Sequence, residues 1–254
     1  MFVDVHAHLC DGKYGGDIET YVTAYRNAGV ELVINSGYNL PSSELVMQKS
    51  QLYSDMYFSA GVHPDDAKTL NKGDIDRLLC VLKDKKCVAV GEIGFDFYWN
   101  KSTEEEQIFA FEKQMELADH LSLPFVIHSR EASAKTLAFL KDRKSLLKNG
   151  FLMHCFSESA EMAKEYQKLG GYFSFGGVIT FKNANKGDII KSVPLDRLLL
   201  ETDCPYMTPV PNRGKLNEPK FIAHTCSFIA NVLDFSEKKL EELTTQNAKR
   251  FFGI

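Results

Sequence analysis

Histidines and carboxylates recur along the chain, and these are the side chains from which proteins build sites for divalent metals. An HxH pair stands near the N-terminus, and further residues of ligand type follow at wide spacing. The candidate metal ligands are His6, His8, Glu92, His128, His154 and Asp203. An HxH pair alone carries little weight, whereas a set of this size predicts a site at which a metal activates a water for hydrolysis.

Six ligands suffice for two divalent ions. We expect His6, His8 and Asp203 to bind one ion, and His128 and His154 to bind the other. Glu92 is then expected to bridge the two. Imidazole nitrogens favour Zn²⁺ or Mn²⁺ over Mg²⁺, which prefers oxygen ligands. The sequence does not exclude Mg²⁺ as the bound metal. Asp203 is also expected to accept the proton of the attacking water, so Asp203 and Glu92 are the predicted catalytic residues.

The elements that must position these residues are short apolar runs separated by helical patterns. Strands are expected near 2–6, 31–35, 56–62, 87–92, 124–128, 150–154, 171–175 and 197–202. Helices are expected near 17–28, 42–53, 73–83, 103–121, 131–145, 158–169 and 184–192, with two more near 218–232 and 236–249. The ligand residues end or follow these strands, and the C-terminal strand ends of an α/β barrel meet at one mouth.

Eight strands alternating with helices predict an α/β fold with a parallel sheet, either closed or open. An open dinucleotide-binding sheet would need a glycine-rich turn after the first strand, and histidines stand there instead. We therefore predict a single (β/α)8 TIM barrel with an extra C-terminal helix. Although 254 residues would also suit two domains, barrels of this length are common, so one domain over residues 1–254 is expected.

Composition excludes some classes of function. The net charge of −4 shows no basic excess, so a broad duplex-binding surface is not expected, and contact with a nucleic acid should be local. No apolar run approaches the roughly 18 residues of a membrane span, and the first residues lack a basic start, so neither a membrane span nor a signal peptide is expected. Six cysteines without a CxxC pair indicate reduced thiols. A cytoplasmic location is expected, and no partner protein is indicated.

Seven short motifs occur in one order over nearly the whole chain. They are DVHAH at 4–8, GVHP at 61–64, GEIGFD at 91–96, IHSR at 127–130, HCFS at 154–157, ETDCPY at 201–206 and RGKLNEP at 213–219. With these motifs the chain resembles the TatD family of metal-dependent deoxyribonucleases, which belong to the amidohydrolase-like metallohydrolases. The resemblance implies a (β/α)8 barrel, divalent metals and hydrolysis of phosphodiester bonds, with 3′-to-5′ trimming of DNA.

The resemblance also assigns roles to individual residues. It places the family's metal ligands on the six candidates named above, and it places His63, Asp96 and Arg130 near the substrate. Arg213 and Lys215 lie in a loop rich in proline and glycine. Such residues either contact phosphate or belong to an ordinary solvent-exposed loop, and the resemblance to the family favours phosphate contact. The family's HCFSG motif reads HCFSE here, so Glu158 replaces a glycine. The sequence therefore does not determine the shape of that loop.

The predicted function is a deoxyribonuclease of the 3′-5′ exonuclease type, acting on single-stranded DNA ends with water activated by two metals. The alternative is an amide or ester hydrolase of the same superfamily, such as a D-aminoacyl-tRNA deacylase. The same metals can polarise a carbonyl group, and a fold does not determine its substrate. A scaffold without activity is disfavoured because it would not need an intact ligand set.

Overall fold

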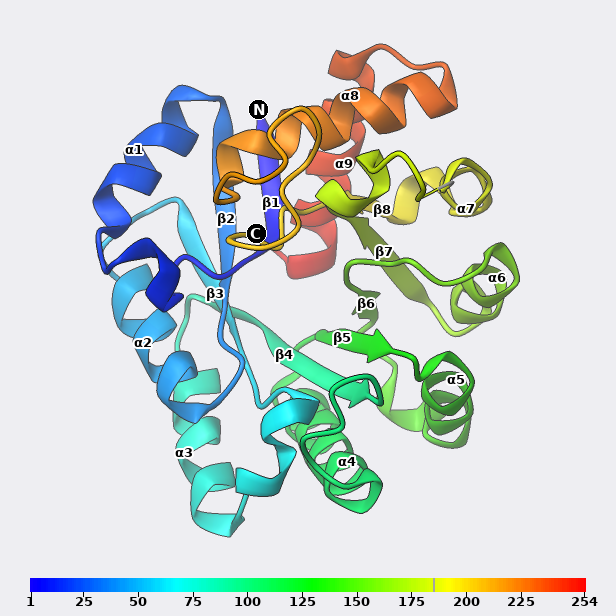
Figure 1. The fold of residues 1–254 in the computed structure, drawn as a ribbon. Coiled ribbons are helices and arrows are strands. Elements are labelled where there is room, and N and C mark those ends of the chain that lie inside the picture. The colour runs from blue at the N-terminus through cyan, green and yellow to red at the C-terminus, as the bar shows by residue number, and fades with distance from the viewer. Residues whose placement is uncertain (185) are drawn as a thin grey trace. The chain divides into compact units, whose positions relative to one another are not determined.

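Strands and helices alternate along the computed structural model, which describes residues 1–184 and 186–254 (Figure 1). The strands are β1 (Phe2–Ala7), β2 (Val30–Ser36), β3 (Met56–Ala60), β4 (Cys87–Asp96), β5 (Phe125–Arg130), β6 (Phe151–Met153), β7 (Gly171–Phe175) and β8 (Leu198–Leu200). The helices are α1 (Ile18–Asn27), α2 (Leu40–Ser50), α3 (Lys72–Leu82), α4 (Glu104–Leu121), α5 (Ser133–Asp142), α6 (Ala160–Lys168), α7 (Gly187–Ser192), α8 (Ile222–Leu233) and α9 (Glu237–Phe252).

The strands follow one another in the sheet in chain order, from β1 to β8. A helix follows each strand, and α9 is additional. This is the (β/α)8 fold with an extra C-terminal helix, so the prediction of the fold class is confirmed. The helix expected near 184–192 begins at Gly187, and residue 185 lies outside the described residues.

The chain divides into two compact units. The terminal unit comprises Met1–Asn35, His154–Lys164 and Tyr172–Ile254, and the central unit comprises Ser36–Met153 and Glu165–Gly171.

In the terminal unit, parallel pairing joins β1 to β2 and β7 to β8. Helix α9 packs against β1 and β8, and Figure 1 shows it beside β1. Both faces of β1 are buried, since Asp4 and His6 are as inaccessible as Val5. A parallel strand covered on both sides must bury its polar residues too, so each of them needs a partner.

In the central unit, β3, β4, β5 and β6 pair in parallel in that order. All ten residues of β4 are buried, and α4 packs across this strand. The ring of Phe95 meets that of Phe111 edge-on, with 5.3 Å between centroids, and Phe111 stacks on Phe139 at 4.7 Å. Helix α4 begins with a capping box in which Thr103 and Glu106 satisfy one another's backbone N–H groups.

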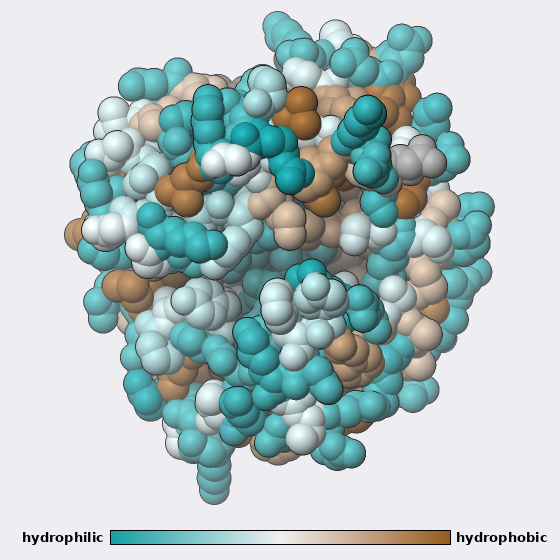
Figure 2. Space-filling view, in the orientation of Figure 1, coloured by the Kyte–Doolittle hydropathy of each residue, from teal (hydrophilic) through white to brown (hydrophobic). Residues whose placement is uncertain are grey.

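Most residues on the molecular face seen in Figure 2 are hydrophilic, with hydrophobic residues in small separate areas. The exposed hydrophobic side chains include Tyr98 and Trp99, which follow β4. Among the helices that the structure describes, none combines the length and the apolarity that a membrane crossing requires.

Candidate metal-binding clusters

Three predicted ligands of the terminal unit form one cluster, which we call the HxH cluster: His6, His8 and Asp203. Their donor atoms all lie within 4.8 Å of one another. The Nε2 atoms of His6 and His8 are 3.1 Å apart, and Asp203 Oδ1 lies 3.4 Å from His8 Nε2 and 3.9 Å from His6 Nε2. Two imidazole nitrogens and a carboxylate oxygen converging in this way are the donor set of a divalent transition-metal site.

Backbone hydrogen bonds hold the two halves of the HxH cluster together. Asp203 lies three residues beyond β8, and its N–H donates to the carbonyl of His6 at 2.9 Å. The N–H of His8 donates to the carbonyl of Cys204 at 2.7 Å. Burial alone would raise the pKa of Asp203, but the hydrogen bond with His8 and the neighbouring imidazoles outweigh it, so this pKa is lowered. The carboxylate is therefore ionised at neutral pH.

His154 lies beside the HxH cluster. It directly follows β6, and its ring stacks on that of His6 with 4.2 Å between centroids. Its Nδ1 atom is 3.8 Å from Oε1 of Glu201, whose other oxygen accepts a 2.5 Å hydrogen bond from the hydroxyl of Ser174. A buried carboxylate that faces a ligand-type histidine is the arrangement that orients metal-binding imidazoles.

Asp4 shares the strand and the side-chain parity of His6, but it has a structural partner. Thr202 donates to Asp4 twice, from its N–H at 2.9 Å and from its hydroxyl at 2.6 Å. Burial raises the pKa of Asp4 to about 8 despite these hydrogen bonds, which act to lower it. Asp4 thus links β1 to the segment after β8 and so helps to position the HxH cluster.

A second group of ligand-type residues lies in the central unit, and we call it the central cluster: His63, Glu92 and His128. Glu92 Oε1 is 2.9 Å from Nδ1 of His128 and 3.6 Å from Nε2 of His63. The two histidine rings meet with 4.2 Å between centroids. The sequence assigned His63 to the substrate, whereas the geometry also makes it a candidate ligand. Its position shortly after the C-terminal end of β3 was the available signal, because the other candidate ligands also lie at or just beyond the C-terminal parts of their strands.

Two glycines allow β4 to pass close enough to β5 for this cluster to form. Gly91 precedes Glu92 with φ of +152°, and a Cβ there would lie 2.7 Å from the carbonyl oxygen of Val126. Gly94 has φ of +140°, and a Cβ there would lie 2.1 Å from the carbonyl oxygen of His128. Any larger residue would be strained in backbone and would push the two strands apart.

Asp96 and Arg130 were both predicted near the substrate; Asp96 contacts His128 of the central cluster, and Arg130 on β5 pairs in register with Asp96. Oδ2 of Asp96 is 3.0 Å from Nε2 of His128, so the carboxylate holds one ring nitrogen while the other faces Glu92. Burial acts to raise the pKa of Asp96, but the hydrogen bonds with His128 and with the N–H of Trp99, together with the neighbouring imidazoles, outweigh it, so this pKa is lowered. The Arg130 guanidinium carbon lies 4.0 Å above the ring of Tyr98.

Arg213 and Lys215 lie in the exposed loop after β8, as expected. The guanidinium carbon of Arg213 is 3.6 Å above the ring of Phe181, and the Lys215 amine donates to Oδ1 of Asn212 at 3.1 Å. Stacking of this kind fixes the direction of an arginine while leaving its charge available. Contact of the two residues with phosphate remains a prediction.

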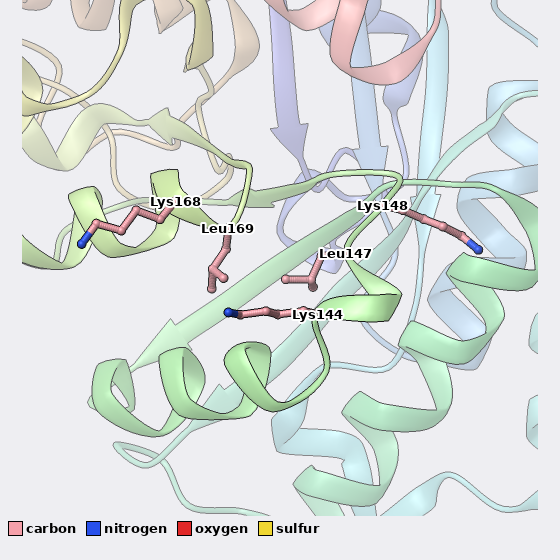
Figure 3. Close-up of a pocket in the computed structure, with 5 residues that line it drawn as sticks. All are labelled: Lys144, Leu147, Lys148, Lys168 and Leu169. Carbon is pink, nitrogen blue, oxygen red and sulfur yellow. The ribbon is translucent and has the colours of Figure 1, made fainter.

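A cavity of about 270 Å³ elsewhere in the central unit is lined by none of the candidate metal ligands. Figure 3 shows its lining, Lys144, Leu147, Lys148, Lys168 and Leu169, with the amines of Lys148 and Lys168 pointing away in opposite directions. Those amines pair with Asp119 and Glu165. These segments precede β6 and β7, at the strand ends opposite to those that carry the ligand residues.

Comparison with known proteins shows the family to which the chain belongs. A family model described as TatD related DNase matches residues 3–253. The uncharacterized metal-dependent hydrolase YabD of Bacillus subtilis (strain 168) is 38% identical over 255 residues, which is 100% of each chain. The protein named 3′-5′ ssDNA/RNA exonuclease TatD of Edwardsiella piscicida is 34% identical over 259 residues, with 99% of each chain covered.

Solved structures agree. YJJV, a TatD homolog from Escherichia coli K12, superposes with a TM-score of 0.93 at 29% identity, covering 100% of this chain and 98% of that one. A hydrolase TatD family protein from Entamoeba histolytica has a TM-score of 0.86 at 22% identity, with coverages of 99% and 97%, and supports the fold.

Proposed function

Since the chain belongs to the family of TatD-related DNases and is a metal-dependent hydrolase, we propose that it hydrolyses phosphodiester bonds of single-stranded DNA from the 3′ end. The observation that carries this proposal is the pair of three-residue clusters, each of which gathers imidazole nitrogens around a carboxylate. A relative of 34% identity is named a 3′-5′ ssDNA/RNA exonuclease, which supports a nucleic acid as substrate.

Each cluster fits one divalent ion by its donor chemistry. The HxH cluster offers two imidazoles and the ionised Asp203, and the central cluster offers His63, Glu92 and His128. When bound, such ions lower the pKa of a water and offset the charge of a phosphodiester. Mixed nitrogen and oxygen donors favour Zn²⁺ or Mn²⁺ over Mg²⁺. The bridging role of Glu92 remains a prediction.

The residues of the chain contribute protons and orientation. Asp203 is ionised at neutral pH and can accept the proton of the attacking water. Asp96 fixes the ring of His128, and Glu201 faces that of His154. Arg130, Arg213 and Lys215 supply the positive side chains that a phosphate backbone needs locally in a chain whose net charge is −4.

The test is a side-by-side assay of the full chain on single-stranded DNA and on D-aminoacyl-tRNA. Metal is removed with a chelator, and Mg²⁺, Mn²⁺ or Zn²⁺ is added back. Stepwise loss of nucleotides from the 3′ end, restored by metal, is the expected result. Deacylation of the tRNA with intact DNA would overturn the proposal in favour of ester hydrolysis.

Variants make the assay specific. Asp203→Asn should lower the rate of DNA cleavage by at least 10²-fold, because the amide cannot accept the proton. Asp234→Asn is the matched control, since Asp234 is exposed and has φ of +56°, close to the +52° of Asp203. Glu92→Ala should lower the bound metal measured by elemental analysis, and full two-metal content in that variant would contradict its role as a ligand.

A further inference from the structure

Two large aromatic side chains stand exposed in the loop between β4 and α4. Tyr98 is 50% and Trp99 is 56% exposed. The Tyr98 and Trp99 rings meet edge-on with 4.9 Å between centroids. Burying an aromatic ring gives a large gain in free energy, and the fold leaves part of that gain unused at both rings. A ligand that covers them would recover it.

This loop is fastened to the central cluster. Oδ1 of Asp96 accepts hydrogen bonds from the N–H groups of Tyr98 and Trp99 at 2.9 Å and 2.8 Å, while Oδ2 meets His128. The buried side chain of Gln107 binds both the N–H and the carbonyl of Asp96. The aromatic pair is therefore held in a fixed position relative to a candidate metal ligand, rather than carried on a loose loop.

Two cations flank the exposed rings. The guanidinium carbon of Arg130 lies 4.0 Å from the centroid of Tyr98 and 5.7 Å from that of Trp99. The amine of Lys101 lies 5.5 Å from the centroid of Trp99 and pairs with Asp65 at 2.7 Å. Flat aromatic faces beside positive charge are the combination with which proteins bind single-stranded nucleic acids, the rings taking bases and the cations taking phosphates.

We propose that Trp99, supported by Tyr98, is a stacking platform for an unpaired nucleobase, and that Arg130 contacts the adjoining phosphate. The platform selects single strands because the faces of a base inside a duplex are already stacked on its neighbours. This inference rests on the proposed nuclease function, which it deepens by naming the residue that recognises the strand.

Trp99 is the only tryptophan in the chain, so intrinsic tryptophan fluorescence reports on this residue alone. The full metal-loaded protein is titrated with a hydrolysis-resistant phosphorothioate hexamer of thymidine, and with the uridine equivalent to compare DNA with RNA. Saturable quenching by the single strands is expected. An abasic hexamer with the same backbone charge should bind with at least about fivefold lower affinity and leave the emission unchanged, because it has no base to stack.

Variants test the platform by binding, with anisotropy of a labelled strand as the readout. Trp99→Ala should weaken binding of the thymidine hexamer about 5- to 100-fold, whereas Trp99→Phe, which keeps an aromatic face, should remain within about threefold of the wild type. Phe109→Ala is the matched control, because Phe109 is a 44% exposed aromatic residue on α4 and should leave the affinity unchanged. Circular dichroism verifies that each variant is folded.

The possible failures are distinguishable. Equal affinity for the abasic and thymidine strands, or unchanged affinity in Trp99→Ala, would overturn the platform even if DNA is cleaved. Tight binding of duplex with the same quenching would overturn the selection of single strands. Quenching by thymidine strands without cleavage under any metal would instead uphold the platform and reject the nuclease function.

Discussion

At the scale of single residues, Asp96 connects the central cluster to the loop that carries Tyr98 and Trp99. One of its oxygens meets His128, and the other holds the backbone of Tyr98 and Trp99. A carboxylate bonded to the far nitrogen of a metal-binding histidine fixes the direction of the ring and increases its basicity. We therefore expect Asp96 to orient His128, a role that differs from that of the candidate ligands themselves.

Asp96→Asn should therefore weaken metal binding at the central cluster about 10- to 100-fold, because an amide is a poorer acceptor of nearly the same shape. Competition with a chelating dye, followed for both ions, is the measurement. The affinity of the HxH cluster provides the internal control, since Asp96 has no part in it. An unchanged affinity at both sites would show that His128 needs no orienting partner.

The sequence singled out the ligand-type residues because their types are unmistakable and they recur at strand ends, and their role as metal ligands stays a prediction. It did not predict the contacts of Arg130 with Tyr98 or of Arg213 with Phe181. Those depend on side-chain packing between segments distant along the chain, which periodicity does not encode. Thr202 as the partner of Asp4 was missed for the same reason.

At the scale of elements, most of the predicted strands and helices agree with the structure to within three residues. The largest differences are at β4, which was expected to end near residue 92 and continues to Asp96, and at α8, which was expected from residue 218 and begins at Ile222. Gly94 concealed the continuation of β4, because glycine usually weakens a strand. Here Gly91 and Gly94 are what allows β4 to lie against β5, as the distances at both positions show.

Gly94→Ala should consequently destabilise the protein by about 2–4 kcal/mol, since it combines an unfavourable φ with a clash against the backbone of β5. Urea denaturation is the measurement. Gly187→Ala is the control, because a Cβ at Gly187 meets nothing within 4 Å and lies at the start of α7. A loss of stability in Gly187→Ala equal to that in Gly94→Ala would contradict the explanation.

An ion pair between Lys141 of α5 and Glu165 of α6 should make the stability of the fold depend on pH. Lys141, and then Lys168, hydrogen-bond the carboxylate of Glu165 and lower its pKa from 4.5 to about 2. A depressed folded-state pKa stabilises the fold above the unfolded value, and this stabilisation is lost as the pH falls from about 4.5 towards 2. Because Glu165 is partly exposed, the effect should be small.

Lys141→Ala should raise the pKa of Glu165 towards its ordinary value, which NMR titration of the side chain can follow. The difference in melting temperature between Lys141→Ala and the wild type should be largest near pH 6 and should shrink as the pH falls towards 2. Lys141→Arg retains the charge and should behave like the wild type. A difference that is independent of pH would show that packing, and not the ion pair, is responsible.

At the scale of the whole molecule, the path of the chain predicts how it unfolds. The backbone passes between the two compact units four times, after residues 35, 153, 164 and 171, and α6 contributes residues to both. The terminal unit is assembled from three segments, so it cannot form before the central unit has been synthesised. We infer from this connectivity that residues 1–254 behave as one domain.

Scanning calorimetry of the chain should show one transition, with a calorimetric enthalpy that agrees with the van't Hoff enthalpy. The comparison should be made on metal-free protein, because bound ions stabilise whichever part holds them. Two resolved transitions, or protease release of a stable fragment covering 36–153, would show instead that the units unfold independently.

The two-sided attachment of Asp96 has a thermodynamic consequence. A carboxylate is a rigid planar group, so a displacement of one oxygen is felt at the other. If an ion on His128 pulls the imidazole, the aromatic loop should respond, and a base on Trp99 should alter the ion's affinity by the same factor, as linkage requires. The sole tryptophan would then report metal loading before any strand is added, and strand affinity would rise or fall with the metal supplied.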